Sequence, residues 1–436
     1  MRLAARGQNP PGIPGPFTLF ARTASVAFFL AAPALSAQRI AEVTGRDRHI
    51  EHDFEEIYRV GVVAGESWEM FGAVGRVGFD AAGNLYVFDR SGGGDSRDAR
   101  VVVFDPAGAF VREFGSAGEG PGEFKRANGM AVMRDGTTVV RDGGHDAYHL
   151  FDPSGSFVRM VRFAEQESKV TVFSAIHADP RGGAVFTPEG GGGAGDAAAS
   201  PARPVVRLGL AGEVVDTDTV ALGWLPPRGG EGMEASIEVA GGTFSLGDVL
   251  GGFAMPGEFE PEVLLGVLPE GGLVYSDSSA YALKVTPPGS PEVERVIVRP
   301  FHPEPVTESV RKEYAEKRSG REGTATGTGT NAEGAAVPFA LSFEMPERTF
   351  FPEIPVLRGL SATWEGRIWV RRRGKEPESD GPIDILTVRG EYLGTFRTDA
   401  ATMPDAFGPD GMAAFIELDE LDVASVVVRR LPPAIR

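Results

Sequence analysis

The sequence predicts an all-β fold, a six-bladed β-propeller built from four-stranded antiparallel blades. A glycine-marked hairpin signal occurs six times along the 436 residues, and a second hairpin signal follows five of the six copies. Two hairpins make four antiparallel strands, which is the content of one propeller blade. A blade of this size buries its faces only against neighbouring blades, so we expect the repeats to form a ring.

The first hairpin of each repeat has turn residues, a glycine, and then a run rich in β-branched or aromatic residues. Glycine supplies the positive φ that a tight turn needs, and a strand follows at once. The six copies are DAAGNLYVFDR (80–90), MRDGTTVVRDG (133–143), DPRGGAVFTPE (179–189), LPEGGLVYSDS (268–278), TWEGRIWVRRR (363–373) and GPDGMAAFIEL (408–418). Their turn glycines are Gly83, Gly136, Gly182, Gly271, Gly366 and Gly411.

The second hairpin completes the blade. It reads FDPAGAFVREF (104–114), FDPSGSFVRMV (151–161), LGLAGEVVDTD (208–218), VTPPGSPEVERVIV (285–298) and LTVRGEYLGTF (386–396). The sixth copy lacks it and ends at the run Val426–Val428. We expect the early segment 57–63 to supply the missing outer strand. The ring would then be closed by strands from both ends of the chain, which leaves no open sheet edge.

The spacing of the first-hairpin glycines tests the number of blades. Three spacings are 53, 46 and 45 residues, close to the roughly 40–50 residues of a propeller blade. The other two, 89 and 95 residues, favour insertions at about 224–257 and 303–350, with seven or eight blades as the alternative. In the second insertion we expect a short helix capped by Thr307 and ending near Arg318. The GTATGTGTNAEG segment (323–334) is expected to be disordered.

The N-terminal segment has the parts of a secretory signal. Residues 1–37 carry three arginines and no acidic residue, followed by an apolar run at 24–35 and the small residues Ser36 and Ala37. The run is about half of the roughly 20 residues that a membrane span needs. We expect cleavage after Ala37, with a retained anchor as the alternative. Residues 38–54 are then an N-terminal linker and residues 55–436 the propeller.

Composition restricts the compartment and the partners. The chain has no cysteine, so packing alone must hold the core. With the export signal, this predicts a bacterial periplasmic or secreted protein, soluble after cleavage and monomeric. The formal net charge of -18 repels phosphate backbones and anionic lipids, so nucleic acid is not an expected partner.

The stretch 79–163 resembles the NHL-repeat propellers, particularly the exported bacterial six-bladed group. It contains FDAAGNLYVFD, RVVVFDPAGAFVREFG and GSAGEGPGEFKRANGMAVMRDG in that order. The resemblance is specific over two blades and covers about half of the mature chain. It implies the fold more firmly than an activity, because related propellers include binding modules as well as a few hydrolases and lyases.

Candidate ligand-binding residues precede or enter the innermost strands, where a propeller presents contacts around its channel. They are Lys125, Arg126, Asn128 and Arg358. Cations converging there would hold an anionic group, and the competing interpretation is that they pair with nearby Asp or Glu. We expect a binding or interaction module for a peptide, a glycan or an envelope protein, with no catalysis and no cofactor.

An enzymatic role is the alternative hypothesis. His145 and His149 are four residues apart, and His177 lies one blade further on, so a metal-assisted hydrolase or lyase would draw on these three. No third histidine or carboxylate-rich motif at metal-ligand spacing completes the pair. There is no Gly-x-Ser-x-Gly elbow, and the glycine-rich GSAGEGPGEF lacks the Lys-Ser/Thr of a phosphate-binding loop.

Overall fold

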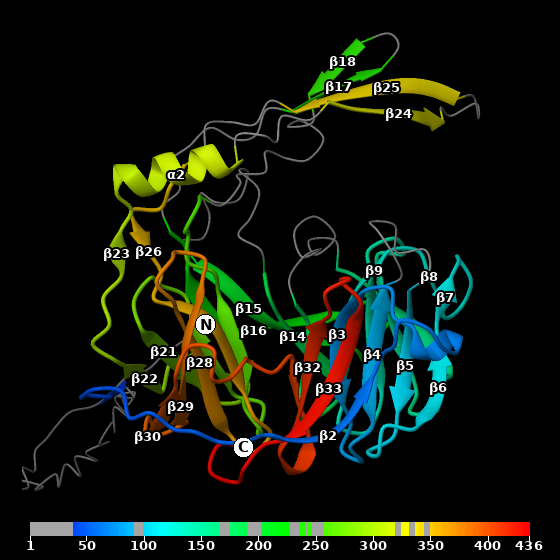
Figure 1. The fold of residues 1–436 in the computed structure, drawn as a ribbon. Coiled ribbons are helices and arrows are strands. Elements are labelled where there is room, and N and C mark those ends of the chain that lie inside the picture. The colour runs from blue at the N-terminus through cyan, green and yellow to red at the C-terminus, as the bar shows by residue number, and fades with distance from the viewer. Residues whose placement is uncertain are drawn as a thin grey trace, which may run out of the picture. The chain divides into compact units, whose positions relative to one another are not determined.

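The computed structural model describes residues 38–90, 99–164, 175–189, 202–226, 257–318 and 349–436, together with the backbone of four strands between residues 235 and 343. Six antiparallel sheets follow one another along this part of the chain as blades (Figure 1). The predicted six-bladed β-propeller is confirmed. Residues 1–37, the predicted signal, lie outside the described residues.

Five blades are built from four consecutive strands each. Blade 1 has β3 (Val74–Phe79), β4 (Leu85–Arg90), β5 (Ala99–Phe104) and β6 (Phe110–Phe114). Blade 2 has β9 (Ala127–Val132), β10 (Thr138–Asp142), β11 (Ala147–Phe151) and β12 (Phe157–Arg162). Blade 3 has β13 (His177–Ala178), β14 (Ala184–Pro188), β15 (Ala202–Gly209) and β16 (Asp216–Trp224). Blade 4 has β19 (Leu264–Val267), β20 (Leu273–Ser276), β21 (Ala282–Thr286) and β22 (Arg295–Val298). Blade 5 has β27 (Leu357–Ala362), β28 (Arg367–Arg373), β29 (Asp380–Thr387) and β30 (Tyr392–Phe396).

The predicted first hairpins join the first two strands of every blade. All six turn glycines have positive φ, between +74° and +89°. The first strands of several neighbouring blades contact one another, and residues from all six line a cavity, so these strands surround the central channel. The turns of the first hairpins therefore lie at one end of the channel, and the segments that enter the first strands lie at the other.

Blade 6 combines both ends of the propeller. It consists of β31 (Ala406–Phe407), β32 (Met412–Leu418), β33 (Ala424–Arg430) and, as the outer strand, β2 (Glu55–Val60), with a 3₁₀ turn at Pro409–Gly411. In the antiparallel pairing of β2 with β33, Tyr58 stands opposite Val428 and Val60 opposite Val426. The predicted closure of the ring by N- and C-terminal strands is confirmed.

The segment 38–54, expected as a linker, also contributes a strand. β1 (Arg39–Glu42) runs parallel to β22 and makes blade 4 five-stranded. Further along, Asp47 bonds Arg299 at 3.1 Å and Arg372 at 2.5 Å. This segment therefore fastens the chain to blades 4 and 5 before β2 reaches blade 6.

The core consists of apolar layers between blades. Strand β4 shows how the two-residue period of a strand produces them. Leu85 and Val87 pack with residues of blade 6, whereas Tyr86 and Phe88, on the opposite face, pack with residues of blade 2. Corresponding buried clusters join the other neighbouring blades. Each blade is thus a wedge that is apolar on both faces.

The two predicted insertions pair with each other. The hairpin β17 (Ala235–Val239) and β18 (Gly242–Ser245) comes from the first, and β24 (Thr324–Thr330) and β25 (Ala336–Phe343) come from the second. They form one sheet in the order β18-β17-β25-β24. The expectation of disorder over 323–334 is therefore wrong for Thr324–Thr330, because its four threonines favour a strand and β25 supplies the partner.

The predicted helix is present as α2 (Glu308–Arg318). The N–H of Val310 donates to the Thr307 hydroxyl at 3.4 Å, and Tyr314 is buried against Phe259 with ring centroids 4.7 Å apart. The short pairs β23 (Glu304–Pro305) with β26 (Glu353–Ile354), and β7 (Ser116–Ala117) with β8 (Glu123–Phe124), complete the strands. A 3₁₀ turn at Ser67–Glu69 precedes β3.

Candidate functional site

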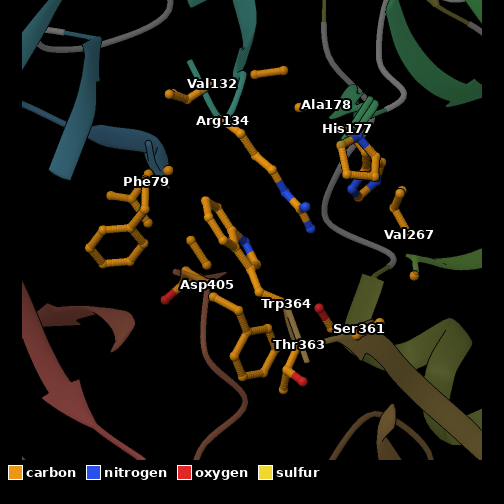
Figure 2. A pocket seen from close by; sticks show the side chains of 18 of the residues that line it. Phe79, Val132, Arg134, His177, Ala178, Val267, Ser361, Thr363, Trp364 and Asp405 are labelled. Atoms are coloured by element: carbon orange, nitrogen blue, oxygen red, sulfur yellow. The ribbon is translucent and has the colours of Figure 1, made fainter. Parts of the chain in front are cut away.

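A cavity of about 210 Å³ lies in the channel near the turns of the first hairpins. Residues of every blade line it, because each first strand turns one face toward the channel. Figure 2 shows the Arg134 side chain reaching into this pocket beside the indole of Trp364. The guanidinium carbon lies 5.0 Å from the centre of that ring, which is cation–π geometry. This end of the channel is therefore narrowed by aromatic and cationic side chains.

Ionisable groups lie deeper in the same pocket. Burial and the nearby Arg76 charge lower the pKa of His177 from 6.5 to about 4, so this ring is neutral at neutral pH. Burial also raises the pKa of Asp405, although the N–H of Ile416 and the charge of Arg76 act against that shift. The charges of Arg76 and Asp405 thus partly balance, and Arg134 adds a second positive charge, so the pocket has a small excess of cations.

A larger cavity, of about 840 Å³, opens where the chain enters the first strands of blades 3, 4 and 5. His177 and Leu265 line both cavities, so the two adjoin along the channel. We call the larger cavity the channel mouth. The charged and titratable residues that line it are His177, Glu189, Arg203, Glu258, Glu260, Glu262, Arg358 and Glu378. Arg358, predicted as a ligand-binding residue, is among them.

Carboxylates outnumber cations at the channel mouth, five to two. Both arginines are also engaged by the protein. Arg203, which is buried, donates to the carbonyls of Trp224 and Pro261 at 3.1 and 2.7 Å and lies 3.8 Å from Glu260. Arg358 lies 3.4 Å from Asp380. Burial raises the pKa of Glu189. The mouth therefore presents negative charge, in contrast to the cationic site that the sequence suggested.

The other three residues predicted to bind a ligand are Lys125, Arg126 and Asn128. They precede or begin β9, at the same end of the channel, but they line neither cavity. Lys125 pairs with Glu119 at 2.8 Å. Arg126 donates to the carbonyl of Gly143 at 2.8 Å, and Asn128 accepts from Arg141 at 2.8 Å. Each has a local partner in blade 2 or in the segment leading to it, and the structure does not bring them together with Arg358.

Two of the three predicted histidines, His145 and His149, lie close together. Asp142, His145 and His149 place potential metal-ligating atoms within 4.8 Å of one another. The Nδ1 of His145 lies 2.9 Å from Asp142 Oδ2, and the Nε2 of His149 lies 3.9 Å from the same oxygen. His177 is in the channel and does not join this group. Asp142 was not predicted from the sequence, although residues 142–149 have the spacing Asp-x-x-His-x-x-x-His.

Asp142 belongs to a repeated structural device. In blade 1, Asp89 accepts from the N–H groups of Gly72 and Ala73 at 3.0 and 3.1 Å, just before the first strand begins. In blade 2, Asp142 accepts from Lys125 and Arg126 at 2.7 and 2.8 Å. Each carboxylate therefore holds the segment that leads into its own blade.

Asp142 and His149 differ in charge at neutral pH. Burial acts to raise the pKa of Asp142, but hydrogen bonds from the N–H groups around it and from His145 lower it overall. Burial lowers the pKa of His149 from 6.5 to about 4. At neutral pH the fully buried His149 is thus a neutral ring beside a carboxylate.

A family model described as a 6-bladed beta-propeller (DUF5128) matches residues 67–170. The match spans blades 1 and 2. Solved structures that resemble the chain include a protein described as exported, from Bacteroides fragilis NCTC 9343 (10% identity, 90% of this chain and 99% of that chain covered, TM-score 0.47). A member of the DUF4221 family from Bacteroides vulgatus is also similar (10% identity, 88% and 99% covered, TM-score 0.47).

Virginiamycin B lyase from Staphylococcus aureus is a more distant relative in structure (10% identity, 87% and 100% covered, TM-score 0.39). Among curated proteins no match is found. Within the described residues, no helix has the length and apolar character needed to cross a membrane.

Proposed function

We propose that this chain is a binding module that takes a positively charged segment of a peptide or partner protein into its channel mouth and does not catalyse a reaction. The observation that carries the proposal is the cavity of about 840 Å³ at the end of the channel, with five glutamates and only two arginines on its walls. The arginines are held by carbonyls and by Glu260 and Asp380, and His177 is neutral. A lysine or arginine of a ligand would therefore meet an excess of carboxylates over cations.

Size supports a segment rather than an extended surface. Ligand pockets that enclose a drug-sized molecule have roughly 300–1,000 Å³, and the channel mouth falls in this range. The apolar side chains of Phe259, Leu264 and Leu357 lie among its walls and offer contact for the stem of a long cationic side chain. The acidic net charge of the whole chain would steer such a ligand toward the protein.

The test is binding of a labelled short peptide of alternating lysine and glycine, measured by fluorescence anisotropy. We expect saturable binding that weakens as salt is added, because partly exposed charges are screened. Replacing Glu189 and Glu262 together by Gln should weaken binding about tenfold or more. The matched control replaces the exposed Asp216 and Asp218 of β16 by Asn, which removes the same charge away from the channel mouth and should leave binding unchanged.

Three results would overturn the proposal. The first is equal affinity for a peptide in which glutamate replaces lysine, and the second is equal affinity for a neutral oligosaccharide. The third is cleavage of the bound peptide, which would make the protein an enzyme. Equal loss of binding in the double Gln variant and in its control would show that net charge, and not the mouth, determines affinity.

We also propose that the protein is exported and that its repeats are of the NHL type. Residues 1–37 support export through their arginines, apolar run and small residues before Gln38. The test is N-terminal sequencing of the protein recovered from the periplasm or medium of a bacterial host. A new N-terminus at Gln38 is the expected result. Recovery of the intact chain only in the cytoplasm would refute export.

A further inference from the structure

We propose that Asp142, His145 and His149 form a binding site for a zinc-like divalent transition metal ion in blade 2. The three residues lie at the junction of β10 and β11, outside both channel cavities, so this site is independent of the channel mouth. Two imidazoles and one carboxylate are a donor set that zinc accepts, with a water in the fourth position.

The distances fit such an ion. A tetrahedral zinc with bonds of about 2.0–2.2 Å holds its donor atoms about 3.4 Å apart. Asp142 Oδ2 lies 2.9 Å from His145 Nδ1 and 3.9 Å from His149 Nε2, values on either side of this spacing. All three donors lie within 4.8 Å of one another.

The His149 ring is buried without hydrogen-bond partners in the described part of the chain. This holds for both ring nitrogens, and the side chain is fully buried. The neighbouring rings of Phe124 and Phe157, with centroids 5.6 and 5.9 Å away, accept no conventional hydrogen bond in its place. A buried polar atom without a partner is unfavourable, and a metal ion bound to Nε2 would remove that penalty at one nitrogen.

Blade 4 has a lysine at the position of His149. Lys284 stands opposite Tyr275, two residues before Asp277, just as His149 stands opposite Val140, two residues before Asp142. The Lys284 ammonium reaches Asp277 Oδ2 at 2.7 Å. His149 is too short to make the equivalent bond and leaves 3.9 Å to its carboxylate. A cation between His149 and Asp142 would restore the pairing that the lysine makes in blade 4.

The surroundings orient the ligands. Asp142 Oδ1 accepts from the N–H groups of Arg126 and Gly144 at 2.8 and 2.7 Å, and Oδ2 accepts from Lys125 at 2.7 Å. Hydrogen bonds of this kind fix a metal-ligating carboxylate in place. His145 now bonds Asp142 through Nδ1. When the ion binds Nδ1 of His145, the ring proton moves to Nε2, which has no hydrogen-bond partner in the described part of the chain.

The test uses the full chain stripped with EDTA and titrated with zinc chloride in a calorimeter. We expect one zinc per chain, with a dissociation constant on the order of 1 µM or tighter. His149→Phe and His145→Ala should each weaken binding about 100-fold or more. His177→Ala, which removes a histidine outside the group, is the matched control and should bind zinc as the parent does.

Two further measurements separate a lost site from a misfolded protein. Zinc should raise the melting temperature of the parent and of His177→Ala but not of His149→Phe, whose melting temperature in EDTA reports its fold. Cobalt bound in place of zinc should give the visible absorption of a tetrahedral ion. The proposal fails if the parent binds far less than one zinc per chain, or if both His145→Ala and His149→Phe, correctly folded, bind zinc like the parent.

Discussion

At the scale of single residues, this protein buries both charged and neutral ionisable side chains. Arg299 and Asp384 are both almost fully buried and lie 2.7 Å apart. The carboxylate also accepts from the Thr395 hydroxyl at 2.6 Å, and the guanidinium also bonds Asp47. These bonds satisfy most of the groups that burial removes from water. His149, equally buried, has no such partners.

The neutral His149 makes stability depend on pH. Its pKa is about 4 in the folded protein, against 6.5 when the ring is exposed. Between these values the unfolded chain binds the extra proton, so the free energy of unfolding falls as pH is lowered from about 6.5 to 4. The loss is on the order of 3 kcal/mol for this residue alone. Urea denaturation in EDTA at several pH values should show a smaller loss in His149→Phe than in the parent.

The pKa of His177 is also lowered, so His177 contributes a loss of stability with falling pH in both the parent and the variant. The difference between parent and variant therefore isolates His149. If both lose stability equally over this range, the ring is not held neutral by burial.

At the scale of the elements, the first hairpins are the most local feature of the fold. Gly182 has φ +84° and nothing within 4 Å of the place where a Cβ would stand. Alanine there should cost only the strain of the left-handed conformation, about 1–2 kcal/mol. Gly136 has φ +89°, but its Cβ would lie 3.1 Å from the Tyr86 hydroxyl and 3.2 Å from Pro153. Denaturation should therefore find Gly136→Ala less stable than Gly182→Ala.

Equal costs for the two substitutions would mean that neighbouring side chains move aside freely at Gly136. A cost near zero for Gly182→Ala would mean that its turn relaxes to another conformation. Either result would show that the hairpin is less rigid than its packing between blades suggests.

Most of the elements that sequence reasoning predicted correctly have a local signal; the exception is the pairing of β2 with β33, which was predicted because the sixth repeat lacks its second hairpin. A turn glycine followed by an alternating strand is contained in about ten residues, and so is the helix capped by Thr307. The pairing of β1 with β22 joins segments more than 250 residues apart and has no local signature. The sheet formed by the two insertions has the same property, because β17 and β25 recognise each other only in the folded chain.

At the scale of the whole molecule, the ring places residues of different blades around one channel. Of the four residues predicted to bind a ligand, Arg358 lines the channel mouth, and its role there stays a prediction. Sequence reasoning did not predict the acidic character of the mouth, since Glu189, Glu258 and Glu378 come from segments with no shared motif. It also did not combine Asp142 with the two histidines, because a carboxylate at a strand end usually serves the backbone, as Asp89 does here.

The joining of β2 to β33 also makes the order of synthesis matter. A ribosome releases residues 55–60 long before it releases residues 424–430, so β2 waits for its partner until blades 1 to 5 and the first strands of blade 6 have been made. A product that stops early, for example within blade 5, leaves β2 unpaired and the apolar face shared by blades 6 and 1 uncovered. The closing strand pair thus distinguishes a closed ring from an open one, because only the closed ring buries that face.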